Sequence, residues 1–140
     1  MTLRHECANG CYAQLHMPDW AFLRGAFPRG IQPTDLDGFI EINGHFLTLE
    51  WKGEGAELTD GQRFAFRRRT MNQTDAVLVL YGDSKRTQCT AMRVIVNGFI
   101  GQRVPANNQR VFERCERWAA WAQSRVPNGG PRQTMKAGAK

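Results

Sequence analysis

The chain has 140 residues, a net charge of +6, and charged and apolar fractions typical of a soluble globular protein. It has no apolar run long enough to span a bilayer and no amino-terminal signal segment, so the sequence argues against a membrane protein. The four cysteines are therefore expected to be free thiols in a reducing compartment, which predicts a cytoplasmic location.

The positive charge is concentrated at the carboxyl-terminal end. Residues 1–102 contain 11 basic and 11 acidic side chains, whereas residues 103–140 contain 8 basic and 2 acidic ones. Of the 19 basic residues 15 are arginine, the type suited to bidentate contacts with phosphate. Residues 127–140 lack apolar periodicity. We therefore expect one domain over residues 1–126, a disordered basic tail over 127–140, and a polyanionic partner.

In chain order, residues 3–27 are expected to be helical or irregular, and residues 28–34 form a connector rich in proline and glycine. A β-hairpin with its turn at Asn43-Gly44 then runs to Lys52. A helix is expected over residues 60–72, followed by strands over 76–81 and 89–95 and a helix over 108–124. This order predicts an α/β fold.

A cluster of charged residues lies at the open end of the expected hairpin. Asp37 and Glu50 are thirteen positions apart and would lie near each other on the two strands. Glu50 and Lys52 share one face of their strand, and the backbone carbonyl of Trp51 lies between them. Two carboxylates and a carbonyl oxygen are suitable ligands for Mg²⁺. Asp35 shares a face with Asp37, so either residue can be the ligand.

The order Pro33 to Asp37, then Glu50-Trp51-Lys52, then Leu58-Thr59-Asp60-Gly61-Gln62 resembles the PD-(D/E)xK nuclease superfamily. The branches that contain phage nucleases and archaeal Holliday-junction resolvases are the most similar. The resemblance covers residues 33–70, and the rest of the chain only by the order of elements. It implies a restriction-endonuclease-like core, with a mixed central sheet flanked by helices.

The resemblance also implies a function and roles for individual residues. The chain would hydrolyse DNA phosphodiester bonds with Mg²⁺ or Mn²⁺, in a bacterial host cell if a phage encodes it. Asp37 and Glu50 would be metal ligands and Lys52 the catalytic lysine, with Gln62 near the attacking water or the DNA. Asp37 is favoured over Asp35 because its distance from Glu50 along the chain matches the family's hairpin. Glu6 would correspond to a glutamate on the family's first helix.

The helix expected over residues 108–124 carries a basic stripe. Arg110, Arg114, Arg117 and Arg125 fall within an arc of about 80° that also contains Trp121. The stripe could follow a phosphate backbone while Trp121 stacks on a base, or the arginines could simply stack on Trp121. Arg67, on the preceding helix, is a further candidate for a phosphate contact. The expected core face consists of Val111, Phe112, Cys115, Trp118, Ala119 and Ala122.

Other interpretations stay open at this point. Thr59 and Gln62 fit a helix capping box, which explains Gln62 without catalysis. The same fold could bind nucleic acid without cleaving it. His5, Cys7, Cys11 and His16 could hold zinc in a small interaction domain, although their spacing matches no standard zinc finger. A homodimer is possible, as in many nucleases of this superfamily.

Overall fold

The computed structural model describes residues 19–34 and 36–125, which fall into two compact units that meet in the chain between Asp37 and Gly38. The first unit contains two short 3₁₀ helices, η1 (Trp20–Leu23) and η2 (Pro28–Gly30). Asp19 caps η1, since its Oδ1 accepts a hydrogen bond from the Ala21 amide at 2.9 Å. η1 lies in the segment that was expected to be helical or irregular, and η2 lies in the expected connector over residues 28–34.

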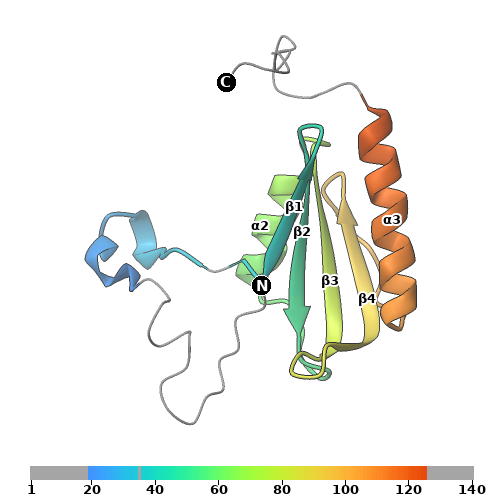
Figure 1. The fold of residues 1–140 in the computed structure, drawn as a ribbon. Coiled ribbons are helices and arrows are strands. Elements are labelled where there is room, and N and C mark those ends of the chain that lie inside the picture. Colours follow the sequence, from blue (N-terminus) through green and yellow to red (C-terminus); the bar gives the residue numbers. More distant parts are fainter. Residues whose placement is uncertain (1–18, 35, 126–140) are drawn as a thin grey trace, which may run out of the picture. The chain divides into compact units, whose positions relative to one another are not determined.

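The second unit is a mixed β-sheet with two helices, which confirms the predicted α/β class (Figure 1). The strands follow the order β1-β2-β3-β4-β5, and β6 pairs with β4. β2 and β3 are parallel, while β1–β2 and β3–β4 are antiparallel. The elements are β1 (Gly38–Ile42), β2 (His45–Lys52), α2 (Asp60–Thr70), β3 (Asp75–Asp83), β4 (Gln88–Val96), β5 (Phe99–Ile100), β6 (Val104–Pro105) and α3 (Asn108–Ser124).

The predicted hairpin is present with its turn at Asn43-Gly44. Both turn residues have positive φ, 58° and 82°, as a type I′ turn requires. The β1–β2 ladder runs from Ile42 opposite His45 to Gly38 opposite Leu49. From Glu50 to Lys52, β2 pairs only with β3 in the described ladder. The charged end of β2 therefore extends beyond the end of its hairpin partner.

Alternation along the strands divides the apolar core between the two faces of the sheet. On one face, Leu78 and Leu80 of β3 pack with Val111 and Trp118 of α3. On the other face, Val77 and Val79 pack with Phe66 of α2. The two helices thus cover opposite faces of the sheet, and β3 is buried between them (Figure 1). Glu50 and Lys52 belong to the α2 face, because even-numbered β2 residues pair with odd-numbered β3 residues.

The helix boundaries agree closely with the prediction, but one core assignment is wrong. α2 ends at Thr70, two residues earlier than expected, and α3 has the expected bounds. Phe112 is 59% exposed, whereas Val111, Cys115 and Trp118 pack against the core and Ala122 is buried. Because α3 rests on only one sheet face, its buried stripe is narrower than the sequence pattern indicated. No helix within residues 19–34 and 36–125 is long and apolar enough to cross a bilayer.

Candidate functional site

Three of the expected site residues meet on the α2 face of the sheet. The Glu50 side chain projects from β2 and the residue is only 8% exposed. Its Oε1 lies 3.8 Å from Lys52 Nζ and accepts a hydrogen bond from Gln62 Nε2 at 3.0 Å. Lys52 is on the same strand face, and Gln62 comes from the first turn of α2. The structure therefore brings together Glu50, Lys52 and Gln62 around one carboxylate oxygen.

Gln62 owes its position to the capping box at the start of α2. Thr59 Oγ1 accepts a hydrogen bond from the Gln62 amide at 3.2 Å, and Gln62 Oε1 accepts one from the Thr59 amide at 3.1 Å. The oxygen of the Gln62 side chain thus serves the helix, and its nitrogen serves Glu50. The capping and site roles of this residue exist together.

Other expected site residues belong to the first unit or lie outside the described residues. Asp37 is exposed and directly precedes Gly38, the first residue of β1. Asp35, Glu6 and the His5/Cys7/Cys11/His16 group lie outside the described residues. Within the described ranges, no three His, Cys, Asp or Glu side chains form a metal-binding group. The metal-ligand roles expected for Asp37 and Glu50 stay predictions.

The structure adds a second polar cluster on the same face, which the sequence did not indicate. Arg93 of β4 lies opposite Val79, which lies opposite Glu50, so the three residues form one row across the sheet. Tyr81 lies opposite Lys52 in the neighbouring row. The Arg103 guanidinium stacks on the Tyr81 ring, 4.0 Å from its centroid. The only sequence signal was Arg93, a charged residue at an inward-facing position of a strand.

A carboxylate from the β2–α2 loop links the two arginines of this cluster. Glu57 Oε2 lies 3.3 Å from Arg93 Nη2, and Glu57 Oε1 lies 3.4 Å from Arg103 Nη1. Arg103 Nη2 also donates to the Glu54 carbonyl at 2.9 Å. The Arg93 side chain is 13% exposed, whereas that of Glu57 is 49% exposed. The arginine pair is thus fixed in the protein, while its acidic partner borders solvent.

Tyr81 is the buried centre of the second cluster. Burial raises the pKa of its hydroxyl above the ordinary value, and nearby Glu57 raises it further, while Arg93 and Arg103 oppose these effects. Within the described part of the chain, the Tyr81 hydroxyl and Arg93 Nε have no hydrogen bond of good geometry, although the Glu57 carboxylate lies close enough to the hydroxyl to act on it as an acceptor. The Glu57 carboxylate is therefore the group that the protein itself places against these buried donors.

A β-bulge beside Tyr81 shapes this end of the sheet. The register shifts between Tyr81 and Gly82, and Gly82 has a φ of 148°. A Cβ on Gly82 would lie 2.1 Å from the Gln88 carbonyl oxygen, so no other residue fits without a backbone shift. Bulges commonly re-aim side chains next to functional sites.

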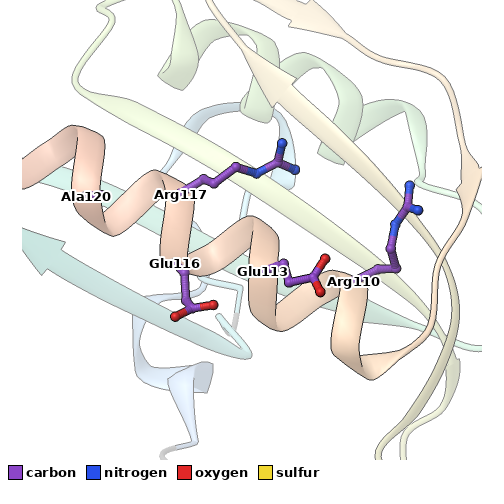
Figure 2. Close-up of a pocket in the computed structure, with 5 residues that line it drawn as sticks. All are labelled: Arg110, Glu113, Glu116, Arg117 and Ala120. Carbon is purple, nitrogen blue, oxygen red and sulfur yellow. The ribbon is translucent and has the colours of Figure 1, made fainter.

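The arginine stripe of α3 lies on the opposite sheet face from Glu50. Acidic residues interrupt the stripe: Figure 2 shows the Glu113 carboxylate between the side chains of Arg110 and Arg117, with Glu116 on the next turn. These four side chains border a shallow depression whose two guanidinium and two carboxylate groups balance in charge. The two glutamates weaken the positive field at Arg110 and Arg117, whereas Arg114 and Arg125 of the stripe do not border this depression.

Trp121 and Arg67, the other expected nucleic-acid contacts, have partners within the protein. The Trp121 ring meets the buried His45 ring edge-on, with centroids 4.9 Å apart, and Arg125 lies over its face at 5.5 Å. Trp121 nevertheless remains 42% exposed. Arg67 Nε donates to the Gly98 carbonyl at 3.4 Å from an exposed position on α2. Both residues contribute packing or hydrogen bonds whether or not they contact DNA.

Comparisons of the chain with family models, with characterised proteins and with solved structures find no match.

Proposed function

We propose that this protein is a metal-dependent DNA endonuclease of the PD-(D/E)xK type with a restriction-endonuclease-like core. The observation that carries the proposal is the convergence of Lys52 and Gln62 on Oε1 of the buried Glu50. Buried ion pairs are weak contributors to stability, since apolar side chains of the same size usually hold a fold as well. The arrangement of Glu50 and Lys52, with Gln62 from the next helix, is therefore better explained by a catalytic role than by a contribution to stability.

We assign the metal ligands to Asp37 and Glu50, with the Trp51 backbone carbonyl as a third oxygen and Asp35 as the alternative carboxylate. Asp37 directly precedes Gly38, which pairs with Leu49, so a ladder one residue longer would set Asp37 opposite Glu50. One or two carboxylates are the usual protein share of a Mg²⁺ site. A bound Mg²⁺ or Mn²⁺ would acidify a water molecule and neutralise charge on the phosphate.

The chain's own groups supply the remaining steps. Lys52 Nζ is 3.8 Å from Glu50, beyond hydrogen-bond distance, so its ammonium can turn to orient the attacking water or neutralise phosphate charge. Gln62 fixes the direction of the Glu50 carboxylate, which has about four lone-pair sites and can accept this donor while it also binds a cation. Gln62 is thus a positioning residue in the proposed mechanism.

A cleavage assay on duplex, single-stranded, branched and nicked DNA, with Mg²⁺, Mn²⁺ or EDTA, tests this proposal. We expect metal-dependent cleavage that Glu50→Gln and Lys52→Ala each reduce by about 10³-fold or more, with unchanged circular dichroism. Matched controls are Glu41→Gln and Arg86→Ala, whose side chains are exposed and outside the site. Full activity in either site variant would contradict the assignment, and DNA binding without cleavage by the wild type would indicate a binding module.

A further inference from the structure

The second polar cluster has a composition that suits a phosphate group. Arg93 and Arg103 present guanidinium groups, which bind phosphate oxygens through planar pairs of N–H donors. The buried Tyr81 hydroxyl adds a neutral donor, and neither it nor Arg93 Nε has a hydrogen bond of good geometry within the described residues, the Glu57 carboxylate being the acceptor next to the hydroxyl. Buried donors without a well-formed hydrogen bond cost free energy, and a bound phosphate would supply the acceptors that they need.

The contacts of Glu57 indicate that another anion can displace its carboxylate from Arg93 and Arg103. Its two carboxylate oxygens lie 3.3 and 3.4 Å from the arginines, longer than the 2.7–2.9 Å usual for charge-assisted hydrogen bonds. Its side chain is about half exposed. The loop that carries it is held by the hydrogen bond from Arg103 Nη2 to the Glu54 carbonyl, and a Cβ on Gly53 or Gly55 would meet no atom within 4 Å. The carboxylate therefore holds the arginines loosely from the solvent side.

We propose that Arg93, Arg103 and Tyr81 form a binding subsite for a backbone phosphate of a nucleic-acid strand, which Glu57 occupies until the strand displaces it. Arg93 lies in the same row of the sheet as Glu50, two strands away or roughly 10 Å between their backbones, and Tyr81 lies in the neighbouring row. That separation suits a phosphate one or two nucleotides away from the one being cleaved. The inference rests on the proposed nuclease function for its substrate, but it can be tested without cleavage.

Inorganic phosphate is the first probe, titrated into the full chain without divalent metal while the arginine Nε–Hε signals are followed by NMR. We expect Glu57→Gln to bind phosphate more tightly and Arg103→Gln to bind it about tenfold more weakly than the wild type. The controls Glu41→Gln and Arg86→Gln remove the same charges at exposed positions away from the two arginine groups and should change affinity less than about twofold. Equal effects of the site and control variants would overturn the subsite.

A labelled oligonucleotide is the second probe, measured by anisotropy in EDTA over a range of salt concentrations. The slope of log affinity against log salt should become shallower by about one for Arg103→Gln and steeper by about one for Glu57→Gln. Oligonucleotides with a 5′-hydroxyl and with a 5′-phosphate should respond alike. A response confined to the 5′-phosphate would overturn the assignment to a backbone phosphate.

The two proposals can fail separately. If Glu50→Gln cleaves DNA normally while Glu57→Gln still tightens phosphate binding, the catalytic assignment is wrong and the subsite stands. If Glu57→Gln leaves phosphate binding unchanged while Glu50→Gln abolishes cleavage, the subsite is wrong and the nuclease assignment stands. Arg93→Gln is a secondary variant because its burial makes unfolding a competing explanation, whereas Arg103 is more exposed.

Discussion

The Gln62 side chain donates a hydrogen bond to Glu50 Oε1 at 3.0 Å while it accepts one from the Thr59 amide at 3.1 Å. One residue thus links the start of α2 to the carboxylate of β2. The parallel β2–α2–β3 connection places that helix start close to the charged end of β2. The capping residue is also part of the candidate site, because the helix start needs the acceptor oxygen of the Gln62 amide and Glu50 needs its donor nitrogen.

The two roles of Gln62 can be separated by comparing Gln62→Ala with Thr59→Ala. Each variant loses a capping bond, so each should lower the free energy of unfolding by about 1 kcal/mol. Only Gln62→Ala also loses the bond to Glu50, so we expect its cleavage rate to fall about tenfold further. Denaturant unfolding and cleavage rates measure the two effects. Equal activity in the two variants would leave Gln62 with a capping role alone.

The Glu50–Lys52 pair should be dispensable for folding. We expect the double variant Glu50→Leu/Lys52→Met to unfold with a free energy within about 1 kcal/mol of the wild type, or higher, while it loses cleavage. Glu50→Leu alone should be less stable than the double variant, because it leaves the partly buried Lys52 ammonium without its partner. Urea unfolding of the wild type, Glu50→Leu, Lys52→Met and the double variant closes the cycle. A loss above about 3 kcal/mol in the double variant would show that the pair supports the fold.

The Tyr81 hydroxyl should contribute little to stability. Within the described residues its acceptor is the Glu57 carboxylate, without a hydrogen bond of good geometry, so Tyr81→Phe should change the free energy of unfolding by less than about 1 kcal/mol. The same variant should bind inorganic phosphate more weakly. A clear loss of stability in Tyr81→Phe would mean that the hydroxyl is already satisfied in the folded protein.

The raised pKa of Tyr81 has a definite consequence for alkaline unfolding. Because the folded state holds this proton more tightly than the unfolded chain, the stabilising contribution is complete below the ordinary tyrosine pKa of about 10 and is lost as pH rises through the higher folded value. Ultraviolet difference titration against Tyr81→Phe isolates the transition. Glu57→Gln should shift it to lower pH, since Glu57 raises the pKa. Ionisation of Tyr81 below pH 10 would contradict the burial argument.

The arginines of α3 are expected to matter less for DNA binding than Arg103. Glu113 and Glu116 lie among Arg110 and Arg117, and this helix covers the sheet face away from Glu50. We expect Arg110→Gln/Arg117→Gln to weaken oligonucleotide binding less than Arg103→Gln alone, measured by anisotropy at one salt concentration. A larger effect of the double variant would make α3 the principal DNA surface. Thermal melts of both variants control for folding.

Local patterns in the sequence were sufficient for the elements and for part of the site. The Asn43-Gly44 turn fixed the hairpin, and strand alternation put Glu50 and Lys52 on one face. The capping box fixed the start of α2 and thereby brought Gln62 to Glu50. Each of these predictions depends on residues within about a dozen positions of one another.

The second polar cluster depends on long-range pairing and could not be predicted in this way. Arg93 and Arg103 reach Glu57 across 36 and 46 positions, and only the order and register of the strands brings them together. Tyr81 belongs to an apolar run, where a tyrosine is indistinguishable from other core residues. The wrong assignment of Phe112 to the core has the same origin, because the apolar pattern of a helix does not reveal how wide a stripe of that helix the sheet will cover.

The hairpin turn also bears on the order of folding. The Asn43 side-chain amide donates to the carbonyl oxygens of Ala122 and Arg125, at the end of α3. These two residues lie 79 and 82 positions after Asn43 in the chain, so the hairpin turn completes the hydrogen bonding of a helix end that is made much later. During synthesis the turn can form as soon as its own few residues have left the ribosome. α3 reaches its final place only after the chain has been synthesised through Ser124. During synthesis the sheet face beneath α3, with Leu78 and Leu80, would stay uncovered until last. Chains cut short before residue 122 should therefore expose this face and aggregate more readily than chains that include the whole helix.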